Sequence, residues 1–143
     1  MSIPPGLPEF PDKRLKIEPC GSRVTCDPCR PDADYDWLVQ IMPDNDGPFD
    51  GSVSEQRICD IAEQLGNEGF VLEGSEHYQS VAANSFMSWR LGEHNLIVTA
   101  NAAFAARHRA ATACCKRLNL LNKPDRIALF QAVLYGAIWT ETP

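Results

Sequence analysis

Two strand-like segments, residues 15–20 and 34–42, are separated in the sequence by a stretch that carries Pro28 and Pro31. Apolar and polar residues alternate along the first segment, which is the pattern of a strand with one buried face. The second segment is apolar enough to lie in the centre of a sheet. Because proline lacks the backbone N–H that the interior of a sheet or helix needs, residues 24–32 are expected to form a loop. The sequence therefore predicts two strands joined by this loop, and the fold has to be built around them.

Further along the chain, strand patterns alternate with helical ones. The expected elements are a helix that begins at the capping pair Ser52 and Glu55 and ends near Gly66, a short strand over residues 70–73, strands over 86–91 and 94–99, and helices over 101–118 and from Pro124 to Ile138. Gly92 and Glu93 join the strand pair as a two-residue hairpin loop, for which a positive φ is expected at Gly92. This order predicts an α+β fold in which a small mixed β-sheet is covered by helices.

Length and composition fit one domain. With 143 residues, of which 44% are hydrophobic and 22% charged, the chain can bury one core. Four of the eleven prolines lie within residues 1–13, which are expected to form an extended arm, and residues 14–143 are expected to form the domain. No apolar run approaches the ~20 residues of a membrane helix, and the N-terminus lacks the charged and apolar regions of a secretory signal. A cytoplasmic protein without membrane association is therefore expected.

The charge balance limits the partners. The formal net charge of −6 argues against non-specific binding to a nucleic-acid backbone, because such binding depends on Lys and Arg side chains that neutralise phosphates. Basic residues do gather where one predicted helix ends and the next begins, at Lys116, Arg117, Lys123 and Arg126. We interpret them as solvated charges that compensate the helix dipoles.

Six cysteines are many for this length, but their spacing predicts no metal centre. Cys26 and Cys29 form a C-x-x-C pair, and no second such pair is present in the sequence. The adjacent Cys114 and Cys115 diverge by about 100° on a helix, which makes them poor ligands for one tetrahedral zinc. We therefore expect the thiols to serve mainly as small buried apolar groups.

The residues that carry chemistry lie on either side of the predicted loop. Asp34 and Asp36 are two residues apart on a strand, so their carboxylates are expected on one face, where they can share a Mg²⁺ ion. Gly21 permits close approach of the backbone to a ligand, and Ser22 offers a hydroxyl group to a phosphate. Arg23 is expected to add positive charge to the same phosphates. Together these residues predict metal-assisted nucleotide chemistry.

In this arrangement the chain resembles the nucleotidyltransferase superfamily, which includes DNA polymerase beta and the aminoglycoside nucleotidyltransferases. The mark of that family is a strand that ends in a hydrophobic residue followed by Gly-Gly or Gly-Ser, a variable loop, and Asp-hydrophobic-Asp or Glu. Residues 20–22 (Cys-Gly-Ser) and 34–36 (Asp-Tyr-Asp) match this pattern. Residues 95–99, 117–120 and 123–132 are similar to small phage-encoded members, which would place the protein in a host cytoplasm.

The resemblance implies a nucleotidyltransferase-like fold over residues 13–138 and a defined reaction. Gly21 and Ser22 would hold a nucleoside triphosphate, and Asp34 and Asp36 would hold Mg²⁺ or Mn²⁺. A nucleoside monophosphate would pass from the triphosphate to an acceptor hydroxyl, with release of pyrophosphate. The acceptor stays open between a small molecule, an RNA end and a protein side chain.

One position departs from the family pattern. Members usually carry a third acidic residue on a neighbouring strand, and Asn95 occupies that place here. An amide oxygen can coordinate a metal, but an amide accepts no proton from a hydroxyl group at neutral pH. Glu73, Glu93 and His94 are the alternatives for a general base.

Three hypotheses follow. The first is an enzyme, a nucleotidyltransferase in which Asn95 joins Asp34 and Asp36 in the catalytic site. The second is a catalytically impaired protein of the same fold that binds a partner protein or a nucleotide. The third is an α+β domain in which the two motifs coincide by chance.

Overall fold

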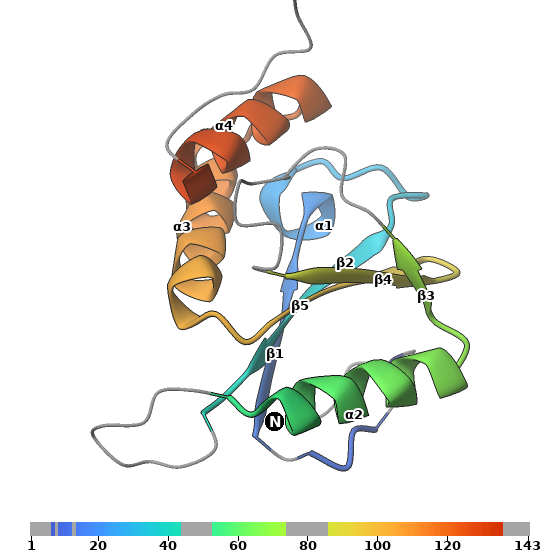
Figure 1. Cartoon of the computed structure of the whole chain (residues 1–143). Helices are drawn as coiled ribbons and strands as arrows, with labels where there is room; N and C mark the ends of the chain where they lie inside the picture. The colour runs from blue at the N-terminus through green and yellow to red at the C-terminus, as the bar shows by residue number, and fades with distance from the viewer. Residues whose placement is uncertain (1–6, 8, 13, 44–52, 74–85, 136–143) are drawn as a thin grey trace, which may run out of the picture.

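The computed structural model describes residues 7, 9–12, 14–43, 53–73 and 86–135 (Figure 1). These residues form a five-stranded mixed sheet and four helices, in the order β1 (Leu15–Cys20), α1 (Ser22–Thr25), β2 (Tyr35–Ile41), α2 (Glu55–Asn67), β3 (Val71–Glu73), β4 (Met87–Leu91), β5 (His94–Thr99), α3 (Ala102–Leu118) and α4 (Lys123–Tyr135). The predicted α+β class with a small mixed sheet is therefore confirmed.

The strands lie in the order β1-β2-β5-β4-β3. β1 and β2 are antiparallel, as are β5 and β4, and β4 and β3. Only the central pair in the described sheet, β2 and β5, is parallel. A parallel pair needs a crossover connection, and the chain between β2 and β5 contains α2, β3 and β4. The parallel pair places the starts of β2 and β5 at the same edge of the sheet.

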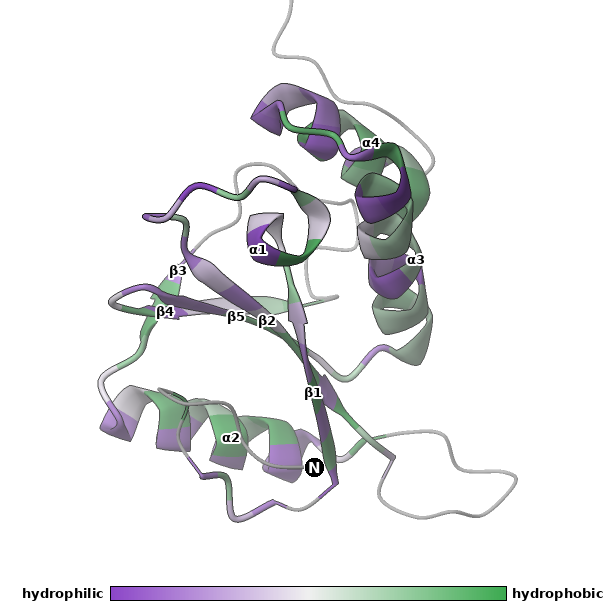
Figure 2. Cartoon of the chain, turned by 180° about the vertical axis from the view of Figure 1, so that it is seen from behind, coloured by the Kyte–Doolittle hydropathy of each residue, from purple (hydrophilic) through white to green (hydrophobic). Residues whose placement is uncertain are grey.

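Helices cover both faces of the sheet (Figure 1). α2 lies on one face, and its Ile61 and Leu65 are buried against a core that includes Val39, Leu96 and Val98. In Figure 2 hydrophobic and hydrophilic residues alternate along α2, as expected for a helix with one face on a sheet. α3 and α4 lie on the opposite side of the sheet. The members of the second core are Phe104, Ala111 and Cys115 of α3 with Phe130 and Leu134 of α4.

Short polar side chains cap the ends of α2 and α3. Ser54 is the N-cap of α2, since its hydroxyl oxygen accepts a hydrogen bond from the backbone N–H of Arg57 at 3.3 Å. The expected cap, Ser52, lies outside the described residues. Asn101 caps α3 in the same way through Phe104 N–H at 3.0 Å, and Asn119 ends it in the left-handed region.

The sequence predicts a hairpin loop at Gly92 and a loop over residues 24–32, and the structure differs from the second prediction. Gly92 has a φ of 58°, which confirms the hairpin loop between β4 and β5. Residues 24–32 were expected to form a loop throughout, but α1 makes one helical turn over Ser22–Thr25 directly after β1. The backbone N–H groups of Val24 and Thr25 donate to the carbonyl of Gly21, which closes this turn.

The described part of the N-terminal arm lies against the domain. Phe10 is 2% exposed and belongs to the core beside α2. The carboxylate of Asp12 forms an ion pair with Arg57 of α2, with Nε at 2.8 Å, and the same guanidinium donates to the carbonyl of Met42. In the described residues there is no helix that is both long enough and apolar enough to cross a membrane.

Candidate functional site

Four residues from neighbouring strands form a row across the sheet, near the end at which β2 and β5 begin. Cys20 on β1 pairs with Asp36 on β2, Asp36 pairs with Asn95 on β5, and Asn95 pairs with Arg90 on β4. Residues directly opposite each other in a sheet point to the same face. This face is the one that α3 and α4 cover, because the next residues of the same face, Leu38 and Ile97, pack with Ala105 of α3.

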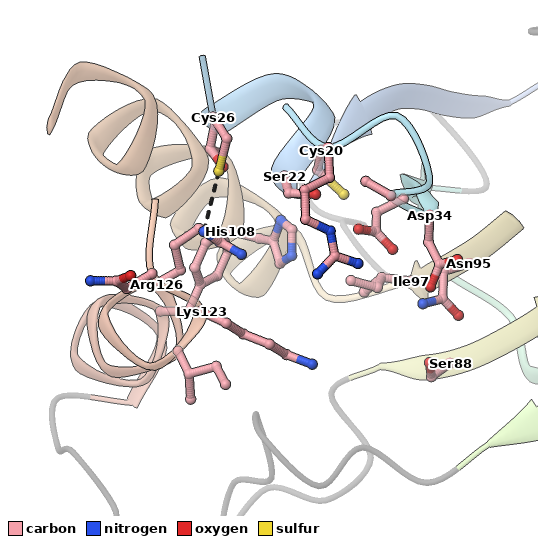
Figure 3. Close-up of a pocket in the computed structure, with 18 of the residues that line it drawn as sticks. Cys20, Ser22, Cys26, Asp34, Ser88, Asn95, Ile97, His108, Lys123 and Arg126 are labelled. Carbon is pink, nitrogen blue, oxygen red and sulfur yellow. Dashed lines mark hydrogen bonds between the residues drawn. The ribbon is translucent and has the colours of Figure 1, made fainter. Parts of the chain in front are cut away.

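A cavity of about 820 Å³ opens between this row and the two helices (Figure 3). Its volume lies in the range of small-molecule and cofactor sites. One wall is acidic and polar, with Asp34, Asp36 and Asn95. The other is basic, with Lys123 and Arg126 of α4, and Figure 3 shows the Lys123 side chain reaching into the space between the walls.

Gly21 and Asp36 are in direct contact at the centre of the acidic wall. A Cβ atom on Gly21 would lie 2.0 Å from Oδ2 of Asp36 and 2.7 Å from its Cγ. The φ of Gly21 is 73°, in the region that L side chains rarely adopt. Only glycine therefore lets the turn after β1 approach the carboxylate on β2 this closely, and Ser22 lines the cavity directly after it.

The environment of Asp36 disfavours its charge. Burial raises the pKa of Asp36 to about 6, and the neighbouring carboxylate of Asp34 acts in the same direction. The side-chain amide of Asn95 hydrogen-bonds to Asp36, and the charges of Arg90 and Lys123 also oppose the rise. The chain by itself thus leaves in this cavity a buried carboxylate whose charged form is disfavoured.

Asp34 lies just before β2 and is held by Arg90. Both terminal nitrogens of the Arg90 guanidinium lie 3.2 Å from Oδ2 of Asp34, and its Nε lies 2.9 Å from Oε1 of Glu73. All three side chains are partly exposed, at 35% to 44%. From its place on β4, Arg90 therefore connects the start of β2, beyond β5, with the neighbouring strand β3.

The structure distinguishes the three candidates for a general base by whether they line the cavity. His94 points to the opposite face of the sheet, where its Nδ1 accepts a hydrogen bond from Nε1 of Trp37 at 3.1 Å and its ring stacks on Tyr35. Glu93 lies in the hairpin loop and is not among the residues that line the cavity. Of the three, Glu73 alone lines it.

Arg23 contacts the loop that precedes β2 and does not line the cavity. Its Nε donates to the carbonyl of Ala33 at 2.9 Å, and one terminal nitrogen donates to Pro31 at 3.0 Å. Its guanidinium lies 3.9 Å above the ring of Tyr35, whose side chain faces away from Asp36 along the strand. The side chain fixes the loop before β2, and Arg30 is the arginine of this loop that lines the cavity.

The basic residues between α3 and α4 divide into two pairs. Lys116 and Arg117 are exposed in the last turn of α3, as expected. Lys123 is exposed at the start of α4, but it and Arg126 also line the cavity, which the interpretation as solvated helix-end charges did not include. Nη1 of Arg126 lies 3.2 Å from Sγ of Cys26, and this contact connects α4 to the loop after α1 (Figure 3).

His108 of α3 is a cavity residue that the sequence did not indicate. It is 2% exposed, and burial lowers its pKa to about 4, with the charge of Arg109 acting in the same direction. Its Nδ1 is buried and has no hydrogen-bond partner among the described residues. The surrounding sequence is an alanine-rich helix, where one histidine carries no signal of its location.

The donors at the acidic wall are of the kind that could hold one Mg²⁺ ion. Asp34, Asp36 and Asn95 offer two carboxylates and an amide oxygen, and Mg²⁺ takes oxygen ligands and commonly binds through one or two carboxylates plus substrate phosphates. In the part of the chain that the structure describes, no three His, Cys, Asp or Glu residues gather in a metal-binding cluster. A site with two Asp residues therefore needs ligands from a substrate.

No protein-family model, no curated protein and no solved structure matches this chain. The function is consequently argued from the geometry of the cavity and from the chemistry of the residues that line it.

Proposed function

We propose that the chain is a Mg²⁺-dependent nucleotidyltransferase with a nucleotidyltransferase-like fold. The reaction is the transfer of a nucleoside monophosphate from a nucleoside triphosphate to an acceptor hydroxyl. One observation carries the proposal: the Gly21 turn lies against Asp36, and both face a cavity whose opposite wall is basic. Acidic and basic walls that face each other suit a ligand that brings both a divalent cation and several phosphates.

The phosphates would lie between the turn after β1 and the first turns of α4. Ser22 offers a hydroxyl group, and the absence of a side chain at Gly21 lets phosphate oxygens approach the backbone. Lys123, Arg126 and Arg30 line the cavity with positive charges that can neutralise a triphosphate.

Asp34, Asp36 and the amide oxygen of Asn95 would hold the cation. Bound there, Mg²⁺ would neutralise phosphate charge and polarise the α-phosphate. Asp36 has a further reason to bind a cation, because burial disfavours its charge and a bound cation would offset that cost. Mn²⁺ has the same preference for oxygen ligands and would replace Mg²⁺ in an assay.

The chemical step joins the acceptor oxygen to the α-phosphorus and breaks the bond to the departing pyrophosphate. The proton of the acceptor hydroxyl needs a base, and Glu73 is the carboxylate opposite Asp34 that lines the cavity. Arg90 forms ion pairs with both Glu73 and Asp34 and so would hold the two carboxylates in place beside the bound acceptor. The acceptor is a small molecule, an RNA end or a protein, and a cytoplasmic location would supply the triphosphate.

A transfer assay tests this proposal. Each of the four α-labelled nucleoside triphosphates is incubated with Mg²⁺, the purified protein and candidate acceptors, and both pyrophosphate release and label transfer are followed. We expect transfer by the wild type and a loss of at least about a hundredfold in Asp36→Asn. Glu18→Gln is the matched control, since Glu18 is on the same face of the sheet but pairs with Arg109 away from the cavity. Equal rates in Asp36→Asn and wild type would contradict the proposal.

A second candidate function is nucleotide binding without transfer. It is favoured by the register of β5, which places Asn95, an uncharged residue, directly opposite Asp36. Asn95→Asp distinguishes the two candidates. A protein that only binds nucleotides is expected to gain measurable transfer when this carboxylate is supplied, whereas an enzyme adapted to Asn95 is expected to lose activity.

A further inference from the structure

The inner part of the cavity has the properties of a pocket for a heteroaromatic ring. His108 enters it from α3, and Figure 3 shows its imidazole on the side of the helix that faces the cavity. Its Nδ1 is buried without a hydrogen-bond partner among the described residues. Buried polar atoms are nearly always paired in folded proteins, so an unpaired one in a cavity wall is available to a polar atom of a ligand that enters the cavity.

The surroundings of this nitrogen are apolar and aromatic. The ring of His108 lies 5.0 Å from Phe130 in an edge-to-face arrangement and 5.9 Å from Phe104. Phe86 stacks on Phe104 with centroids 5.0 Å apart. The residues of this part of the cavity wall are Phe86, Ile97, Ile127 and Phe130. A flat apolar ring with a polar edge fits such a wall, whereas a phosphate does not.

From this geometry we infer that the inner cavity binds the nucleobase of the substrate and that Nδ1 of His108 selects among bases through a hydrogen bond to the base edge. The inference rests on the proposed function, because it takes the ligand to be a nucleotide. His108 is a specificity residue here and takes no part in the chemical step.

The state of the imidazole supports this role. With a pKa of about 4, His108 is neutral at physiological pH, so one ring nitrogen donates and the other accepts. If Nδ1 accepts, a base edge that presents a donor forms a hydrogen bond with it, and if Nδ1 donates, an edge that presents an acceptor does so. A base that places an acceptor against an acceptor, or a donor against a donor, leaves both Nδ1 and the base atom unpaired. A site that hydrogen-bonds its ligand rejects the mismatched analogue strongly for this reason.

Binding measurements with two variants test the inference. Dissociation constants of ATP, GTP, CTP and UTP are measured by calorimetry with Mg²⁺ for the wild type, His108→Phe and His108→Asn. Phe keeps the ring and removes Nδ1, whereas Asn keeps a polar atom near the position of Nδ1. We expect the wild type to prefer one base by about tenfold or more, His108→Phe to lose that preference, and His108→Asn to retain a part of it. Equal affinities in the wild type, or an unchanged preference in His108→Phe, would overturn the inference.

A measurement on the wild type keeps the test valid if the variants fold poorly. The ¹⁵N chemical shifts of the His108 imidazole are recorded with the preferred triphosphate and with inorganic tripolyphosphate. A shift of Nδ1 with the nucleotide alone supports the inference, and identical spectra with both ligands contradict it. Base-selective binding without label transfer would support the inference and contradict the proposed transfer reaction, so the two failures are distinguishable.

Discussion

The carboxylate of Asp36 lies against the backbone of Gly21, so close that a Cβ atom there would be 2.0 Å from Oδ2. The contact joins the turn after β1 to the first residues of β2. The two strands pair at this end, with Cys20 of β1 opposite Asp36 of β2. It therefore fixes the distance between the group proposed to bind phosphate and the group proposed to bind the cation.

A series of three glycine variants separates backbone strain from this contact. Gly66→Ala, at a helical position with no atom within 4 Å of the new Cβ, should leave stability unchanged or raise it by up to about 1 kcal/mol. Gly92→Ala has open space but a φ of 58°, and should cost about 1 kcal/mol. Gly21→Ala combines a φ of 73° with the clash and should cost about 3 kcal/mol. Urea unfolding measures all three, and equal costs for Gly21→Ala and Gly92→Ala would argue against the contact.

Asp36→Asn should stabilise the protein in the absence of divalent cations. Burial raises the pKa of Asp36 from 3.8 to about 6, so its ionised form is less favourable in the folded state than in the unfolded chain. Removing that charge should raise the free energy of unfolding near neutral pH by about 1–3 kcal/mol. The measurement is urea unfolding in EDTA. Asp34→Asn is the control, since it breaks a partly exposed ion pair with Arg90 and should lower stability by at most about 1 kcal/mol.

His108 should make the folded state sensitive to acid. Its pKa falls from 6.5 in the unfolded chain to about 4 in the folded state, because burial and Arg109 disfavour the charge. The unfolded chain therefore binds more protons between these two values, and stability contributed by the neutral side chain is present above pH 6.5 and is lost as the pH falls toward 4.

The variant His108→Phe isolates this effect from other titrating groups. The difference in free energy of unfolding between the wild type and His108→Phe should shift by about 2 kcal/mol in favour of the variant on going from neutral pH to about pH 5. Chemical unfolding at a series of pH values measures it. A difference that stays constant with pH would contradict the buried, neutral state of His108.

Lys123→Ala should weaken binding of a nucleoside triphosphate by about tenfold and flatten its dependence on salt, because Lys123 lines the cavity opposite Asp36. Its stability should be nearly unchanged, since the side chain is exposed. Lys116→Ala removes the same charge from the exposed last turn of α3, away from the cavity, and should bind as the wild type does. Equal losses in the two variants would indicate a general charge effect.

The strands and helices were predictable because each carries its own local signal. Alternation over residues 15–20, the apolar run of β2 and the glycine of the β4–β5 loop correspond to elements of the structure. The helical turn of α1 was missed because prolines mark the loop that follows it and its four residues are too few to show a period.

The acidic wall was predictable and the basic wall was not. Asp34 and Asp36 were selected by their spacing on a predicted strand, and Asn95 by the resemblance to a family that carries a third acidic residue on a neighbouring strand. The observed register places Asn95 directly opposite Asp36. Lys123 and His108 reach the cavity only because α3 and α4 fold back over the sheet, and their neighbours in sequence say nothing of that contact. Arg23 shows the converse, since proximity to Ser22 in sequence suggested a phosphate contact, whereas its side chain holds the loop at Ala33.

We propose that Asp36 and the Gly21 turn together bind a cation and a nucleotide. Electron paramagnetic resonance of Mn²⁺, titrated with protein in the presence and absence of a non-hydrolysable nucleoside triphosphate, tests it most directly. We expect weak Mn²⁺ binding alone, binding about tenfold tighter or more with the nucleotide, and loss of both in Asp36→Asn but not in Glu18→Gln. Mn²⁺ and nucleotide binding that is identical in Asp36→Asn and the wild type would contradict it.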